Sequence, residues 1–309
     1  MSDALQAAAV AGFLAAAVRV ATPLLLAALG ETVTERAGVI NLGLEGALLA
    51  GALAAALGSV ADGPWQGVVL GVMAGAAVSA LLGVIVVVAG ANQIIAGTAV
   101  TLGCVGLTGA VHRAWVANDT AVSVVPTLAA APVPLLSRLP VVGPALFAQP
   151  VPTYAGLVLV PVLWWALFRT RGGLALRAAG ESATMARAAG IQVQLLRIGA
   201  TIFGGAMGGF AGATLVLGQV GSFAERMTAG RGYLAIAIVA LGRWHPVGAA
   251  LAALVFGAAT ALQFVFQSLG LDVPYQLFLM FPYLLTLLGL AGAVGRNRPP
   301  ADLGRDLGS

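Results

Sequence analysis

The chain contains no lysine, a single cysteine and very little charge. All fifteen basic residues are arginine, and charged side chains make up 8% of the 309 residues. A Walker A loop grips phosphates with a lysine, and Schiff-base catalysis needs a lysine amine, so the composition excludes both functions. Cys104 alone cannot form an intrachain disulfide or a cysteine-rich metal site. If ATP drives this protein, another chain must bind it.

Hydrophobic residues dominate what is present. They account for 60% of the chain, and the mean hydropathy is +1.00. A soluble domain carries about 25% charged residues, so lipid must be the solvent for most of this surface. We predict an all-α integral membrane protein, a polytopic bundle of about nine (8–10) transmembrane helices. The expected spans are 5–29, 41–60, 65–89, 93–116, 152–169, 197–218, 231–242 (short), 247–269 and 275–293.

Arginine placement predicts the orientation. Arginines crowd the connection 170–196 and the tail 294–309, so both are expected in the cytoplasm by the positive-inside rule. The proline-rich segment 117–151 should then lie outside, as an ordered loop or a re-entrant piece. The side of the N-terminus stays open.

The chain is expected to form one permease-like membrane domain, 1–309, built from two pseudo-repeats at roughly 1–116 and 152–293. The basis is a faint echo: Glu35-Arg36-Ala37-Gly38 precedes one helix, and 225–230 (Glu-Arg-Met-Thr-Ala-Gly) precedes another. Paired, glycine-interrupted segments are typical of transporters. Two glycine stripes, Gly67/Gly71/Gly75 and Gly204/Gly208/Gly212, indicate close helix packing, with a hinge or pore groove as the less favoured interpretation.

Glu45 is the sharpest single feature. A carboxylate at the centre of a membrane helix costs about 2.5–3.5 kcal/mol, so it normally faces a cavity or a partner. Asn41, four residues earlier, shares its helix face. Two interpretations stay equally open: a polar lining of a transport route, or a structural ion pair with Arg19 or Arg36.

The helix expected at 93–116 carries further polar candidates. Thr98, Thr101 and Thr108 share one face, which more often indicates packing than a pathway because threonines bond their own helix carbonyls. Asn92 and Gln93 open this helix, where they either cap it or face a cavity.

The connection 177–190 differs in kind from the spans. Between Gly180 and Gly190 it holds a run of helix formers, with Glu181 expected in the first turn and Arg187 near the end. Such a helix is too short to be stable alone. A docking element for another protein is favoured over an ordinary solvated loop.

Three segments carry a resemblance to a known family. Residues 35–46 (ERAGVINLGLEG), 92–97 (NQIIAG) and 180–191 (GESATMARAAGI) resemble ABC-transporter permeases of the branched-chain amino acid and simple-sugar superfamily, in its nucleoside and simple-sugar import branch. The resemblance covers nearly the whole chain. Members commonly have an acidic residue or Val where this chain has Gln93, and that departure bears on substrate preference.

The resemblance implies the smaller permease subunit of an ATP-driven importer in the cell (inner) membrane. Its partners would be a second, non-identical permease, a two-domain or dimeric cytoplasmic ATPase that binds ATP and Mg, and an extracellular substrate-binding lipoprotein. No cofactor and no nucleic acid would be bound by this chain. The expected coupling residues are Gly180, Glu181, Ala183, Met185, Ala186, Arg187 and Gly190. The expected substrate-pathway residues are Asn41, Glu45, Asn92, Gln93, Thr98, Thr101 and Phe223.

Two other classes of protein fit the sequence less well. A self-contained secondary transporter could use Glu45 as its coupling carboxylate, but it would not require the cytoplasmic 177–191 segment. An intramembrane enzyme is disfavoured because His112 and His245 are expected near helix ends. Three aspartates that could serve such an enzyme are expected in loops: Asp62, Asp119 and Asp272.

Overall fold

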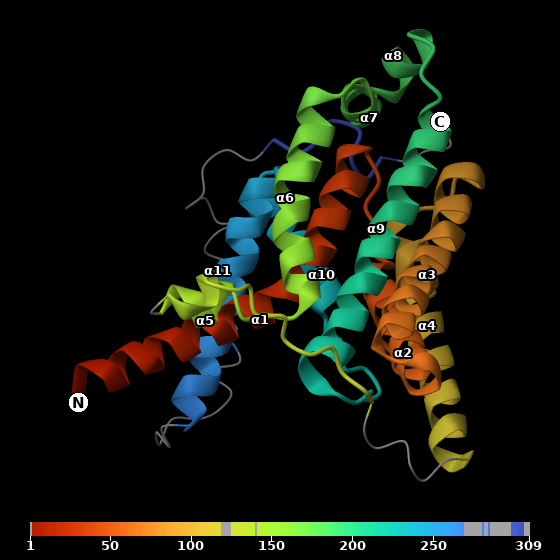
Figure 1. Ribbon diagram of the computed structural model, residues 1–309. Coiled ribbons are helices and arrows are strands. Elements are labelled where there is room, and N and C mark those ends of the chain that lie inside the picture. Colours follow the sequence, from red (N-terminus) through yellow and green to blue (C-terminus); the bar gives the residue numbers. More distant parts are fainter. Residues whose placement is uncertain are drawn as a thin grey trace.

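A computed structural model describes residues 2–118, 125–139, 141–268, 280, 284 and 298–305. These residues form helices and connections, with no strand among them. Seven of the described helices are long and apolar enough to cross a membrane. The expectation of a polytopic helical membrane protein is therefore confirmed (Figure 1).

The expected spans agree closely with the observed helices. Each of the first eight has a helical counterpart, and the short seventh one is α10, with 11 residues. The ninth expected span, 275–293, lies outside the described residues except at Met280 and Leu284. The elements are α1 Ser2–Arg36, α2 Leu44–Asp62, α3 Pro64–Gly83, η1 Val84–Val88, α4 Gln93–Asn118, η2 Leu136–Arg138, α5 Val142–Leu146, α6 Val151–Arg169, α7 Arg171–Glu181, α8 Ala183–Ala188, α9 Val193–Leu215, η3 Val216–Val220, α10 Arg231–Leu241 and α11 Pro246–Ser268.

Three helices that are distant in sequence form the centre of the bundle. α2, α3 and α9 pack against one another, α4 packs on α2, and α1 lies between α9 and α11. The short helices α7 and α8 stand together at one end, beside the described part of the C-terminal tail (Figure 1). The arginines of the connection 170–196 lie at this end, so the positive-inside rule predicts that it faces the cytoplasm.

Both glycine stripes lie in helix contacts, as the packing interpretation predicted. A Cβ atom on Gly209 of α9 would overlap the carbonyl oxygen of Gly71 in α3, and one on Gly75 would overlap that of Gly205. The glycines that face α1 and α2 are equally closed in, with Gly204 against Thr34. Helices in lipid gain little from burying apolar area, so this backbone approach supplies much of their association.

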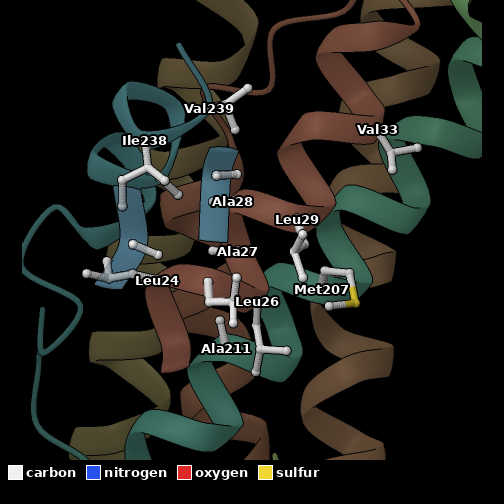
Figure 2. Close-up of a cluster of buried hydrophobic side chains, with 14 of the residues drawn as sticks. Leu24, Leu26, Ala27, Ala28, Leu29, Val33, Met207, Ala211, Ile238 and Val239 are labelled. Atoms are coloured by element: carbon white, nitrogen blue, oxygen red, sulfur yellow. The ribbon is translucent and has the colours of Figure 1, made fainter. Parts of the chain in front are cut away.

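A cluster of aliphatic side chains fills the space between α1 and its neighbours. Leu24, Leu26 and Leu29 of α1 contact Met207 of α9, Ile238 of α10 and nearby alanines (Figure 2). α10 is thereby held against the middle of α1 although it is too short to cross the bilayer.

The described part of the proline-rich segment 117–151 is folded onto the bundle. The backbone N–H groups of Val125 and Leu128 donate to the carbonyls of Gly221 and Leu217. Gln149 is fully buried and donates to the Ala145 carbonyl at 2.9 Å, while α5 packs on α1. These contacts agree with an ordered segment.

The glycine contacts generate a matched test. Gly209→Ala should destabilise the isolated protein in detergent by about 1–3 kcal/mol, because the added methyl group meets backbone that cannot turn aside. Gly103→Ala in α4 is the control, since a Cβ there would have nothing within 4 Å, and alanine favours a helix by up to about 1 kcal/mol. Thermal unfolding measures both variants; equal midpoints would contradict the packing role.

Candidate functional site

The connection between α1 and α2 returns into the bundle and is tied down by the end of α1. The Asn41 N–H donates to Glu31 Oε1 at 3.0 Å, and the Trp244 indole donates to Glu35 Oε2 at 2.5 Å. Arg36 Nε donates to the Trp244 carbonyl at 2.8 Å. The Glu31 and Glu35 side chains are buried and lie one helical turn apart.

Glu31 and Glu35 were not among the expected site residues. Their other carboxyl oxygens, Glu31 Oε2 and Glu35 Oε1, have no hydrogen-bond partner in the described structure. The sequence did carry a signal for this pair, which is the spacing of two glutamates by four residues near the end of an apolar helix. Both lie at the end of α1, where Glu31 accepts from the Asn41 N–H and Glu35 accepts from the Trp244 indole.

Glu45 holds the beginning of α10. Its Oε1 accepts from Thr228 Oγ1 at 2.6 Å and from the Gly230 N–H at 2.9 Å, and its Oε2 accepts from the Gly232 N–H at 2.7 Å. The first N–H groups of a helix have no acceptor within the helix, and a negative charge there is favourable. Gly232 has no side chain, which lets the Glu45 backbone approach closely.

This geometry gives Glu45 a structural partner that the sequence did not predict. The ion-pair interpretation named Arg19 or Arg36, but the donors to the Glu45 carboxylate are Thr228, Gly230 and Gly232. Arg36 donates to the Trp244 carbonyl instead. Glu45 is only 7% exposed. In this conformation its carboxylate is occupied by the second glycine-interrupted segment.

The other polar candidates near the α1–α2 connection are also bonded within the chain. Asn41 is buried and donates through Nδ2 to Ser79 Oγ at 3.2 Å. Gln93 accepts from the Ile40 N–H and donates to the Arg305 carbonyl, both at 2.8 Å. Asn92 is exposed and accepts from the first N–H groups of α4 through Oδ1, so the expectation that it caps this helix is met.

The threonines of α4 do not act as one stripe. Thr98 is exposed and donates to the carbonyl one turn back, and Thr108 does the same from a buried position. Thr101 donates instead to the Leu42 carbonyl at 3.0 Å and joins α4 to the α1–α2 connection.

The aromatic candidate Phe223 and the two histidines each pack against a neighbouring ring. Phe223 is 7% exposed in a cluster with α2, and its ring meets His112 edge-on at 5.0 Å. His245 lies against Phe168; its partial burial and the nearby positive charge of Arg36 lower the pKa of this imidazole. Among the residues that the structure describes, no group of metal-ligating side chains comes together.

The cytoplasmic segment is broken into two helices, which corrects one expectation. Glu181 is not in a first turn; it ends α7, and α8 begins at Ala183. Ser182 has an extended backbone, and its hydroxyl accepts from the Met185 N–H at 3.4 Å, so it separates the two helices and caps the second. Arg187 lies in the last turn as expected, and Gly190 follows with a φ of +80°, which favours glycine.

α8 has two different faces. Ala183 and Ala186 are buried against Ala179 and Val193 of the same chain. Met185 is 77% exposed, and Arg187 is exposed beside it. A groove of about 350 Å³ next to this face is lined by Arg187 and residues 191–195. Gly180 packs on the Arg36 carbonyl, so α7 contacts the α1–α2 connection directly.

The chain is similar to known transporter permeases over nearly its whole length. A nucleoside ABC transporter permease of Lactococcus lactis is 32% identical over 90% of this chain and 91% of its own. A guanosine ABC transporter permease of Bacillus subtilis is 33% identical over 91% of both chains. An ABC transporter permease of Haloferax volcanii, named provisionally for glucose, is 37% identical over 93% of both. No solved structure matches the chain.

The helical bundle and these relatives define the chain as a multi-pass membrane subunit of an ABC transporter, a transport component. Residues 13–290 match the family described as branched-chain amino acid transport system / permease component. The chain belongs to this family.

The Glu45 contacts predict which role its side chain has. Glu45→Ala should lower the stability of the purified chain by about 2–3 kcal/mol, because buried N–H groups at the start of α10 lose their acceptor. Glu45→Gln keeps one acceptor oxygen, so its stability should lie between that of Glu45→Ala and that of the wild type. Thermal unfolding in detergent measures the order. An alanine variant as stable as the wild type but unable to transport would instead favour the pathway role.

Proposed function

We propose that this chain is the smaller permease subunit of an ATP-driven importer for nucleosides, with simple sugars as the next substrate class. The observation that carries the importer assignment is α8, an exposed short helix on the side of the arginine-rich connection. The nucleoside and guanosine relatives support the substrate class. The chain's lack of lysine supports a separate ATPase as the source of energy.

The exposed face of α8 is the proposed contact with that ATPase. Met185 is a flexible apolar side chain that adapts to a partner surface, and Arg187 adds a charge beside the groove at 191–195. The ATPase, a dimer or a two-domain chain, would bind ATP and Mg. Closing of its nucleotide sites would move α8 and the helices attached to it.

The proposed substrate pathway divides by exposure. Asn92 and Thr98 are exposed on α4, so they are available to substrate or to the second, non-identical permease. Asn41, Glu45, Gln93, Thr101 and Phe223 are buried within this chain. We propose that this second group shapes the pathway by holding its helices, and that an extracellular lipoprotein delivers the substrate.

Reconstitution tests the importer assignment. Vesicles holding this chain with its second permease, the ATPase and the binding protein should accumulate labelled guanosine only when ATP is supplied. Unlabelled nucleosides should compete better than glucose, because two of the relatives are named for nucleosides and for guanosine. Vesicles with this chain alone should accumulate nothing. Concentrative, proton-driven uptake by the chain alone would favour the secondary-transporter alternative with Glu45 as coupling carboxylate.

A pair of substitutions tests the docking face. Met185→Glu should reduce co-purification of the ATPase by at least about tenfold, because a charge would be placed in an apolar contact. Met185→Leu keeps the apolar volume and should bind normally. Ala186 is unsuitable for this purpose because a bulky residue there would displace α8 from its own chain. Equal ATPase recovery with both Met185 variants would remove α8 from the interface.

A further inference from the structure

The described part of the C-terminal tail binds the segment that contains α8. The Asp302 N–H donates to the Gly180 carbonyl at 2.9 Å, and Asp302 Oδ2 accepts from the Ala183 N–H at 2.7 Å. One residue of the tail therefore contacts the end of α7 and the start of α8. The Asp302 side chain is only 16% exposed, so it is part of this packing rather than a free surface charge.

The same carboxylate neutralises a buried arginine. Arg197 of α9 is 3% exposed in its side chain, and its Nη2 lies 3.6 Å from Asp302 Oδ2. Its Nε donates to the Ala37 carbonyl at 3.0 Å, and its Nη2 donates to the Ala179 carbonyl at 3.1 Å. A buried guanidinium needs an opposite charge to offset its lost hydration. Arg197 thus joins α9, the α1–α2 connection, α7 and the tail at one point.

A second contact holds the tail to the helices that begin nearby. The Arg305 carbonyl accepts from Gln93 Nε2 at 2.8 Å, and Gln93 accepts in turn from the Ile40 N–H. Gly304 lies against Ile40, where an added Cβ would be 3.0 Å from Cδ1. The tail is therefore attached on one side to α8 and on the other to the start of α4 and the α1–α2 connection.

α8 cannot keep its position without such contacts. It has six residues, and an isolated helix of that length is not stable in water. Its buried face consists of alanines, which offer little area for packing. A hydrogen bond from its first N–H to a carboxylate that also pairs with α9 fixes it to the transmembrane helices.

We infer that residues 300–305 form a strap that makes α8 move together with α1, α4 and α9, and that Asp302 is its main positioning residue. The inference rests on the proposed function, because it assumes that α8 receives movement from an ATPase. Asp302 acts through α8 and Arg197 and touches neither substrate nor nucleotide. Without it, the ATPase would still dock on Met185 and hydrolyse ATP, but the movement would be lost between α8 and the bundle.

The transport experiment uses the complete importer in vesicles. Asp302→Ala should lower the amount of nucleoside imported per ATP hydrolysed by about tenfold, within the range of coupling free energies between sites, while the ATPase still co-purifies. Asp302→Glu should recover part of this ratio, since it keeps the charge. Arg305→Ala is the matched control in the same tail: its side chain is 70% exposed and pairs with Asp302 Oδ1 at 3.3 Å. The contacts of Asp302 Oδ2 with Ala183 and Arg197 do not involve Arg305, so the ratio should stay near that of the wild type.

Hydrogen exchange on the isolated chain gives a readout that does not depend on transport. The peptide covering 178–188 should exchange about tenfold faster in Asp302→Ala than in the wild type or Arg305→Ala, because the Ala183 N–H loses its acceptor. Two results would overturn the strap: the same exchange rate in Asp302→Ala as in the wild type, or the same import ratio in both when the wild-type complex transports. A wild-type complex without ATP-driven uptake would instead overturn the proposed function, and the exchange result would still decide whether the tail holds α8.

Discussion

The hydrogen bonds between Glu45 and the beginning of α10 satisfy a constraint that lipid imposes on the whole bundle. No water is available there for unpaired backbone groups, so a helix that starts inside the protein needs acceptors from another segment. Glu45 accepts from Gly230 and Gly232, 185 and 187 residues away. The carboxylate also matches the positive end of the helix dipole. This contact joins α2, the helix that follows the 35–38 segment, to the glycine-containing segment at 225–230.

The same constraint explains the polar residues around the α1–α2 connection. Its backbone leaves the helix at Arg36, and its free N–H groups and carbonyls are matched by side chains from four other positions: Glu31, Gln93, Thr101 and Arg197. These contacts of the 35–46 motif hold an irregular turn inside the bundle. Polar residues that contact substrate are better sought on surfaces that this chain leaves open, such as those of Asn92 and Thr98.

What could be predicted from the sequence follows from the range of the interactions involved. Span positions depend on length and hydropathy, glycine contacts on spacing within one helix, and the Asn92 cap on residues two and three positions ahead. These local signals placed most of the long helices to within a few residues, although α1 continues to Arg36, seven residues beyond the expected end at 29. The partner of Glu45 and the docking of Asp302 depend on segments more than a hundred residues apart, and the burial of Glu31 depends on a reversal of the chain. A single sequence carries no periodic signal for such contacts. Glu181 was misplaced because Ser182, a residue that favours helix starts, was read as helix interior.

α8 shows why the proposed coupling motif contains both small and exposed residues. Gly180, Ala183 and Ala186 face the chain's own core, and small size there lets α7 and α8 approach α1 and α9 closely. Glu181, Met185 and Arg187 are exposed and can meet another protein. A six-residue helix transmits force only if its inner face is held as firmly as its outer face is bound, because it has no stability of its own. In the proposed mechanism, coupling therefore depends on three distant segments, the 180–191 region, the α1–α2 connection and the tail, with Arg197 and Asp302 at their junction.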